Sequence, residues 1–474
     1  MFLSMNWISD FVDFTGLDKV DLIHRFSLST AEVENEIFFK GSDISGIVVA
    51  EIKSVENHPD SKKLHLLKVD AGDGELTDVV CGAPNVRVGL KTAFAKVGAK
   101  IGDIEIAPRK LAGFISNGMC CSESEIGISD DNSGIMEITD DLPNGTDIKE
   151  AYQVDDIIFE VDNKSLTNRP DLWGHYGIAR EFAALAGREL KPLETVDLTQ
   201  YNNLPKVDMK IEDPLCQRYS CLQVENINTS VSPVNMRIRL FYCGMRAINF
   251  LADLTNYLML EMGQPMHAFD SSYIEGNAIH VRRAHDKEKI MTLDEKEFEL
   301  NENNLVICDG VKPVALAGIM GGLNSEIRDT TEAVIFESAK FARDNIRKSS
   351  RALGQSSDSS ALYSKGVNEY TTAMAMKRAL HLMEELGCGK VSSTHVEVTT
   401  GNSLEPKEMK VSIAKVNGVL GIEVPTEDIV RILTNLGFAP VVSGDELTLM
   451  IPAYREDMED YPDVAEEVIR MYGY

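Results

Sequence analysis

The chain has 474 residues, 43% of them hydrophobic, and a formal net charge of -28, which is enough sequence for roughly three to four domains. Phosphate neutralisation supplies most of the affinity of a generic nucleic-acid binder, so this charge argues against that class for the chain as a whole. Residues 40–110 hold 11 Lys/Arg against 10 Asp/Glu, however, so a nucleic-acid contact is expected to be local to this segment.

The N-terminal sequence and the cysteines favour a cytoplasmic protein. The opening MFLSMNWISDFVDF places Asp10 and Asp13 where a signal peptide needs an unbroken apolar stretch. No apolar run is long enough to span a bilayer. The eight cysteines include no CxxC pair, which favours reduced thiols over a disulfide scaffold or a zinc site.

Segments with different residue patterns follow one another along the chain. Residues 1–39 carry apolar residues at helical spacing, and residues 40 to about 150 alternate short β-rich runs with turn residues, as in a small barrel. Residues 151–195 predict a strand, a polar loop and a long amphipathic helix. A mixed segment at 206–400 includes a helix over MRIRLFYCGMRAINFLADLTNYLMLEMG, and residues 407–474 predict the order strand, helix, strand, strand, helix.

A segment rich in lysine lies in the predicted barrel. Lys62, Lys63 and Lys68 belong to HPDSKKLHLLKVD, and their ammonium groups could meet phosphates. A hairpin whose lysines are simply solvated is the alternative interpretation.

A second group of polar residues interrupts the apolar stretch from 244 to 270. Arg246, Thr255, Asn256 and His267 are its polar positions, and Pro265 fixes the backbone just before the histidine. A histidine in such surroundings is usually a satisfied core residue, but this pattern also suits the wall of a pocket.

Two further features of the mixed segment could belong to a ligand site. The run ALAGIMGG at 315–322 lacks the GK[ST] ending and the G-x-G-x-x-G spacing of phosphate loops, so it indicates either a tight turn or a close backbone approach to a ligand. Glu337 follows a β-rich run, where an acid is costly unless it is paired or faces a ligand.

Four carboxylates gather near residue 460. Asp463, Glu466 and Glu467 are spaced i, i+3, i+4, so they share one side of a first helical turn and repel one another, and Asp457 lies just before them. A capping box of Asp463 and Glu466 would account for two of the acids. Mg²⁺ held by all four would relieve the repulsion, because this cation prefers oxygen ligands. The residue pattern leaves both interpretations open.

Taken together, these motifs resemble the family of bacterial phenylalanyl-tRNA synthetase β subunits. The resemblance rests on motifs that occur in the family's order along essentially the whole chain: NHPDSKKLHLLKVD, SNGMCCSESE, LTNRPDLWGHYGIARE, DLTNYLMLEMGQPMHAFD, ALAGIMGG, FESAKF, SSDSSALYSKGVN and PAYREDMEDYPDVAEEVIRMYGY.

The resemblance implies a multidomain α+β fold. An N-terminal α+β domain would comprise residues 1–39 and 152–195, with a tRNA-binding OB-fold barrel inserted at 40–151. A mixed α/β editing module would follow at 206–400, and a winged-helix-like domain with the Mg²⁺ site at 407–474. The family's catalytic-like and anticodon-binding domains are expected beyond the end of this chain.

The resemblance also implies a function. The chain would belong to an α2β2 phenylalanine–tRNA ligase that uses ATP and Mg²⁺ to charge tRNA(Phe), with the charging chemistry on the α subunit. This chain itself would bind tRNA and hydrolyse mischarged Tyr-tRNA(Phe). A non-catalytic scaffold for tRNA binding or assembly is the alternative.

Roles for single residues follow from the same resemblance. Glu337 would recognise the tyrosine phenol, while His267, Thr255, Asn256 and Arg246 would position the aminoacyl ester and the terminal ribose. The expected pocket lining is Pro265, Ala317, Gly318, Ser357 and Ser359, the last of which adds a hydroxyl where the family often has alanine. Lys62, Lys63 and Lys68 would contact tRNA, and Asp457, Asp463, Glu466 and Glu467 would hold Mg²⁺.

Overall fold

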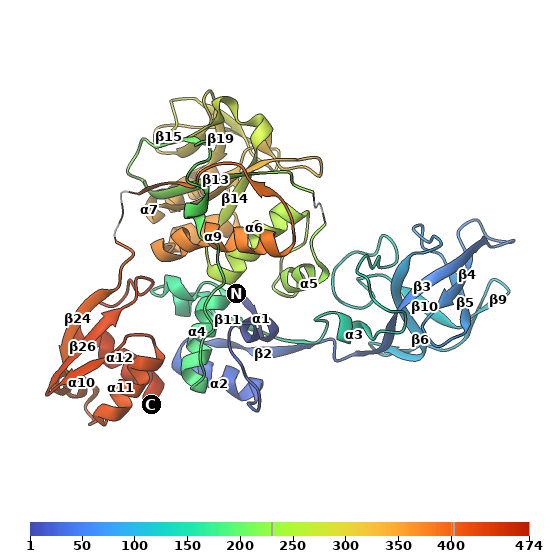
Figure 1. Ribbon diagram of the computed structural model, residues 1–474, viewed down its shortest axis with the longest axis horizontal. Helices are drawn as coiled ribbons and strands as arrows, with labels where there is room; N and C mark the ends of the chain where they lie inside the picture. Colours follow the sequence, from blue (N-terminus) through green and yellow to red (C-terminus); the bar gives the residue numbers. More distant parts are fainter. Residues whose placement is uncertain (229–230, 400, 402, 474) are drawn as a thin grey trace.

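The computed structural model describes residues 1–228, 231–399, 401 and 403–473, and it shows a multidomain α+β protein. Figure 1 shows an N-terminal unit near the centre, a second unit to one side, a C-terminal unit to the other side and a large middle unit above. None of the described helices has both the length and the apolar character needed to cross a membrane. All eight cysteines are free thiols and buried.

The N-terminal unit is built on an antiparallel sheet in the order β1-β11-β2, whose strands come from both ends of the first 161 residues. The Ser4 hydroxyl accepts a hydrogen bond from Trp7 N–H and caps the first helix. Trp7 then stacks on Tyr257 of the middle unit, with ring centroids 4.2 Å apart, so the two units share one apolar core. The elements are β1 (Phe2–Ser4), α1 (Met5–Ser9), α2 (Lys19–Ser29), β2 (Val33–Lys40), β11 (Asp156–Val161), the 3₁₀ turns η1 (Asn163–Leu166), η2 (Pro170–Leu172) and η3 (Leu198–Tyr201), and α4 (His175–Ala186).

The second unit is an antiparallel sheet with the main path β10-β6-β3-β4-β5. Its two edges approach each other, because Asn117 N–H donates to Asp78 O (2.9 Å) and Val80 N–H donates to Ser116 Oγ (3.0 Å). The apolar side chains of β3 and β6 alternate between two clusters, one with Val48, Ala50 and Phe94 and the other with Ile47, Val49 and Ala93, so apolar residues cover both faces of these strands. The elements are β3 (Ile44–Asn57), β4 (His65–Asp70), β5 (Leu76–Cys81), β6 (Lys91–Ile101), β7 (Ile104–Glu105), β8 (Arg109–Leu111), β9 (Phe114–Ser116), β10 (Gly118–Cys121) and α3 (Ile148–Ala151).

The middle unit contains two five-stranded sheets. One has the order β12-β15-β18-β19-β20, and the other has the order β14-β21-β13-β22, with β23 also paired to β13. Strand β21 lies between β14 and β13 and is buried along nearly its whole length, and this buried stretch includes Glu337. The strands are β12 (Asp208–Ile211), β13 (Cys216–Glu225), β14 (Met266–Asp270), β15 (Ala278–Arg283), β16 (Lys289–Met291), β17 (Glu297–Glu299), β18 (Leu305–Cys308), β19 (Pro313–Leu316), β20 (Met320–Gly321), β21 (Val334–Phe341), β22 (Lys390–Val391) and β23 (Val396–Thr399).

The helices of the middle unit differ from the sequence prediction at one point. The stretch 236–263, expected as one helix, is two helices separated by a loop. Gly244 adopts φ +86° after the first helix, and the Asn249 side chain accepts from Ala252 N–H to cap the second. The helices are α5 (Val234–Tyr242), α6 (Phe250–Met262), α7 (Arg343–Leu353), α8 (Asp358–Lys365) and α9 (Glu369–Glu385), with short 3₁₀ turns η4 (Ser271–Tyr273), η5 (Glu275–Asn277) and η6 (Leu323–Ser325).

The C-terminal unit packs three helices on an antiparallel sheet in the order β24-β26-β25. The sequence prediction of two helices is wrong here, because it misses α10, a short helix capped by the Ser412 hydroxyl. The elements are β24 (Lys407–Ser412), α10 (Ile413–Leu420), α11 (Thr426–Asn435), β25 (Val441–Ser443), β26 (Glu446–Ile451) and α12 (Tyr461–Tyr472).

Candidate functional site

A cavity of about 430 Å³ in the middle unit brings together most of the residues proposed from the sequence for the editing site. It is lined by residues of both five-stranded sheets, by α6 and by the start of α8. The proposed residues that line it are Thr255, Asn256, Pro265, His267, Gly318, Glu337, Ser357 and Ser359.

His267 and Glu337 face each other across two paired strands. They are direct partners in the antiparallel ladder of β14 and β21, where opposed side chains point to the same face of the sheet. Both line the cavity. The sheet therefore places an imidazole and a carboxyl group side by side at one wall.

Burial shifts the pKa of each group toward its neutral form. Glu337 is 5% exposed, and burial raises the pKa of its carboxyl group to about 7, against the opposing effect of the hydrogen bond that it accepts from Tyr219 Oη at 2.6 Å. Burial lowers the pKa of His267 to about 4, so this imidazole is neutral. Neither ring nitrogen of His267 has a hydrogen-bond partner in the described part of the chain, so both can serve a ligand.

The glycine-rich run forms the wall opposite His267. A Cβ atom on Gly321 would lie 2.5 Å from Cε1 and 2.9 Å from Nε2 of the His267 ring. Gly318 has φ +68°, and its Cβ would lie 3.0 Å from the rings of Phe341 and Tyr363. The close backbone approach expected for this run is thus an approach to the histidine, and Gly321 is a site residue that the sequence analysis did not single out.

The start of α8 closes another side of the cavity. Ser357 caps this helix by accepting from Ser360 N–H, and its own hydroxyl donates to Ile319 O at 2.6 Å. The Ser359 hydroxyl lies 3.9 Å from Met259 Sδ of α6. Both serines therefore connect the cavity wall to neighbouring elements.

Two of the proposed residues lie elsewhere. Arg246 does not line the cavity: its side chain is 80% exposed, and Nε lies 3.8 Å from Asp130 of the second unit. The loop that follows Gly244 turns it away. Ala317 is 1% exposed and belongs to the apolar core behind the wall. These placements correct the expectation for both residues.

The lysines proposed for tRNA binding lie on the second unit. Lys62 and Lys63 are exposed in the loop between β3 and β4. His58 of the same loop contacts Ala112 O in the β8–β9 turn at 2.9 Å, so the loop and this hairpin form one surface. Lys68 lies on β4 and pairs with Asp78 at 2.7 Å.

The four acids of the C-terminal unit line a common cavity of about 300 Å³, but two of them are bound by arginines. Arg455 donates to both oxygens of Asp457 at 2.8 Å and to Glu467 at 2.9 Å. Burial raises the pKa of Glu467, but the positive charges of Arg470 and Arg455 outweigh this effect and lower the pKa to about 2.

The other two acids remain more accessible. Asp463 Oδ2 accepts N–H groups of Glu459 and Asp460, so the capping box consists of Asp460 and Asp463 rather than Asp463 and Glu466. The Glu466 carboxylate has no ion pair or hydrogen bond to any described residue.

These arginines belong to a network of ion pairs that joins the C-terminal unit to the N-terminal unit. Arg470 also donates to Glu181 of α4 at 2.6 Å, and Arg169 bridges Glu181 (3.0 Å) and Asp171 (2.8 Å). The motif LTNRPDLWGHYGIARE thus supplies the partners of the C-terminal unit.

One other group could hold a metal. Glu194, His381 and Glu385 are the only described His, Cys, Asp or Glu residues whose ligand atoms form such a trio, within 4.8 Å of one another.

Comparisons with known proteins agree on one family. Three family models match the chain: a putative tRNA binding domain at residues 47–147, a B3/4 domain at 215–388 and a tRNA synthetase B5 domain at 409–474. Phenylalanine–tRNA ligase β subunits of Syntrophus aciditrophicus and Neisseria meningitidis serogroup A are each 38% identical over 482 and 478 residues. The alignments cover all of this chain but only 59% and 60% of those proteins.

A solved structure also aligns with part of this chain. An N-terminal fragment of the phenylalanyl-tRNA synthetase β-subunit from Pyrococcus horikoshii aligns with 67% of this chain and 88% of its own, at 19% identity. The TM-score of this alignment is 0.37.

Proposed function

The chain belongs to the phenylalanyl-tRNA synthetase β-subunit family, and on this premise we propose that it binds tRNA and hydrolyses mischarged Tyr-tRNA(Phe) in the 430 Å³ cavity. The observation that carries the proposal is the pairing of His267 with Glu337 at one wall of that cavity. The chain spans about 60% of its relatives' length. ATP-dependent charging by an α2β2 assembly, in the cytoplasm, is therefore proposed for the whole protein.

To select its substrate, the site must recognise the phenolic hydroxyl of tyrosine. Tyrosine and phenylalanine differ by one phenolic oxygen, and a site built to hydrogen-bond that oxygen rejects the analogue without it. Glu337 supports this role because Tyr219 occupies one carboxyl oxygen, Oε2, and Oε1 has no hydrogen-bond partner among the described residues. A tyrosine phenol would donate to this oxygen, whereas phenylalanine would leave a buried polar group unpaired.

Hydrolysis then depends on positioning. The oxygen of a water molecule attacks the ester carbonyl, the bond to the ribose oxygen breaks, and the water proton passes to that oxygen, which releases tyrosine. The neutral His267 ring can orient this water or the ribose hydroxyl, while Thr255 and Asn256 of α6 line the path of the ribose.

The test is deacylation of Tyr-tRNA(Phe) and Phe-tRNA(Phe) by this chain. His267→Ala is expected to lower kcat, and Glu337→Ala to reduce the preference for the tyrosyl ester at least about tenfold. Glu299→Gln, an exposed change on β17, serves as the charge-matched control. Retained tRNA binding without any hydrolysis would favour a non-catalytic scaffold.

The proposal also includes an OB fold and a tRNA contact for the second unit and a winged-helix-like fold for the C-terminal unit. The match to a tRNA-binding model and the approach of the sheet edges support an OB-fold barrel in the second unit. Exposed Lys62 and Lys63 would contact phosphates there, and Lys68 contributes less because it is paired with Asp78. Three helices on a small sheet support a winged-helix-like C-terminal unit.

A magnesium site fits only part of the expected ligand set. Asp457 and Glu467 form salt bridges with arginines. The oxygens that could hold the ion are therefore Asp463 Oδ1 and those of the Glu466 carboxylate. Mg²⁺ is often bound by one or two carboxylates and retains several waters. Bound there, it would supply positive charge at an acidic edge. Asp463→Asn with Glu466→Gln should abolish any Mg²⁺-dependent rise in Tm.

A further inference from the structure

The segment that joins α4 of the N-terminal unit to the middle unit contacts helix α9. Arg378 Nη1 donates to Glu194 O at 3.1 Å, and two residues further along the segment Val196 N–H donates to Lys377 O at 3.2 Å. Arg378 is itself held by the buried Glu261, to which Nε donates at 2.6 Å. The backbone of Glu194 is therefore fixed beside α9 before any ligand binds.

Three side chains converge at this contact. His381 and Glu385 are four residues apart on α9, so they lie on one face of the helix. His381 Nε2 lies 3.3 Å from Glu194 Oε2 and 3.4 Å from Glu385 Oε1, and ligand atoms of all three residues lie within 4.8 Å of one another. In a tetrahedral zinc site with bonds of about 2.0–2.1 Å, neighbouring ligand atoms are separated by about 3.3–3.4 Å. The nitrogen and the two carboxylate oxygens are thus spaced as zinc ligands are.

Within the described part of the chain, the imidazole nitrogen of this group has no hydrogen-bond partner. His381 Nε2 is buried and unpaired, and both carboxylate oxygens lie beyond about 3.2 Å, the usual limit for an N–H···O bond. The Glu194 and Glu385 carboxylates likewise accept no hydrogen bond from a described residue. A buried polar atom without a partner destabilises the fold, and a cation that accepts its lone pair would remove that cost.

The mixture of ligand atoms favours one kind of ion. An imidazole nitrogen with two carboxylate oxygens suits Zn²⁺, whereas Mg²⁺ and Ca²⁺ prefer oxygen ligands. The charges of the two carboxylates balance that of a divalent ion. The side chains of Glu194 and Glu385 are 73% and 56% exposed, which leaves a path for the ion and room for a water molecule as the fourth ligand.

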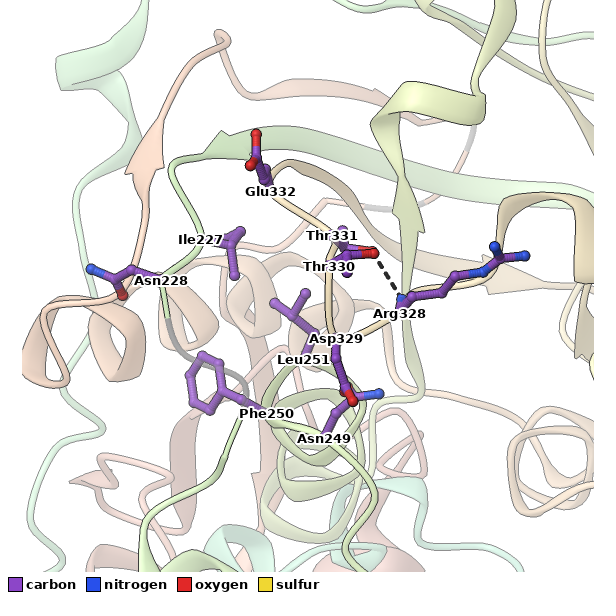
Figure 2. Close-up of a pocket in the computed structure, with 10 residues that line it drawn as sticks. All are labelled: Ile227, Asn228, Asn249, Phe250, Leu251, Arg328, Asp329, Thr330, Thr331 and Glu332. Atoms are coloured by element: carbon purple, nitrogen blue, oxygen red, sulfur yellow. Dashed lines mark hydrogen bonds between the residues drawn. The ribbon is translucent and has the colours of Figure 1, made fainter. Parts of the chain in front are cut away.

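The pocket of about 240 Å³ in Figure 2 also contains two acids, but they do not converge. The carboxylates of Asp329 and Glu332 lie at opposite ends of the labelled group, and none of the described residues that line this pocket is a histidine. Neighbouring acids are expected on a chain with a net charge of -28. What distinguishes the group on α9 is that its acids meet at a buried, unpaired histidine nitrogen.

We propose that Glu194, His381 and Glu385 form a Zn²⁺ site. The ion joins the segment after α4 to α9, and so it holds the N-terminal unit against the middle unit. Its binding stabilises the folded chain, because the three residues are brought together only by folding. The site is independent of the proposed hydrolysis, to which it contributes no group.

The test is a titration of ZnCl2 into the EDTA-treated and dialysed chain at pH 7, by isothermal titration calorimetry with Tm measured in parallel. Excess MgCl2 is present throughout, because it occupies sites made of oxygen ligands alone. We expect Zn²⁺ to bind and to raise Tm. His381→Ala and Glu385→Gln should each weaken binding at least about tenfold and lose the rise in Tm.

The matched control is Glu384→Gln, which removes a neighbouring charge on the same helix. Its carboxylate accepts from Tyr201 Oη at 3.3 Å and does not belong to the group, so this variant should bind Zn²⁺ as the unmodified chain does. Absence of Zn²⁺ binding by the unmodified chain would overturn the proposal. Binding that survives unchanged in Glu385→Gln, which keeps the side-chain shape, would also overturn it, as would equal weakening by Glu384→Gln.

Discussion

The closeness of Gly321 to His267 makes a sharp test of the proposed site. Gly321→Ala adds a Cβ atom 2.5 Å from His267 Cε1, whereas ordinary contacts begin near 3.4 Å, so the ring must move by about 1 Å. Gly321 has no positive φ, so alanine fits its backbone and the effect is purely steric. A displacement of this size at a positioned group can lower a rate about 100-fold, while overpacking costs about 1–3 kcal/mol of stability.

The assay is single-turnover deacylation of Tyr-tRNA(Phe), with Tm measured in parallel. We expect kcat/KM to fall about 100-fold in a variant that remains folded. Gly418→Ala is the control, because its Cβ enters open space on α10, and it should be neutral or stabilising by up to about 1 kcal/mol. Unchanged deacylation by Gly321→Ala in a folded protein would refute the claim that the position of His267 governs hydrolysis.

Other predictions test the buried charges and the tRNA surface. Arg470→Met should lower the free energy of unfolding in urea by about 3–5 kcal/mol, because it removes one of the arginines that pair with buried Glu181. The control is Arg431→Met, which breaks the exposed Arg431–Asp428 pair and should change this free energy by less than about 0.5 kcal/mol. Burial raises the pKa of Glu181, but the positive charges of Arg470 and Arg169 outweigh this effect and hold the pKa below its usual 4.5. The stabilisation that this carboxylate provides is therefore present above pH 4.5 and is lost as the pH falls. Hydrolysis of the tyrosyl ester should increase through pH 7 as Glu337 ionises and accepts the phenol more strongly, and a Glu337→Gln variant that keeps this rise would contradict that role. Replacing Lys62 and Lys63 by alanine should weaken tRNA binding and reduce its salt slope by about 2; an unchanged slope would place the RNA elsewhere.

The ion network at the chain's two ends shows why acidic clusters are hard to interpret from sequence. Spacing alone predicts repulsion among Asp463, Glu466 and Glu467, and a cation is one way to relieve it. The structure relieves the charge of Glu467 with Arg455 and Arg470. The i,i+3 spacing of Glu467 and Arg470 favours their pair, but nothing in the sequence position of Arg455 shows that its side chain turns toward Glu467 rather than toward solvent.

The sequence by itself determined the family, because motifs such as GQPMHAFD and FESAKF occur in the family's order along the chain, and it pointed to most of the expected residues that line the cavity. Only the tertiary structure decided which strands pair, and so that His267 faces Glu337 and that Gly321 touches the histidine ring. It also decided that Arg246 lies outside the cavity and that the long apolar stretch breaks into α5 and α6. Strand pairing and side-chain burial arise from contacts between segments that are distant in sequence, so local residue propensities do not predict them.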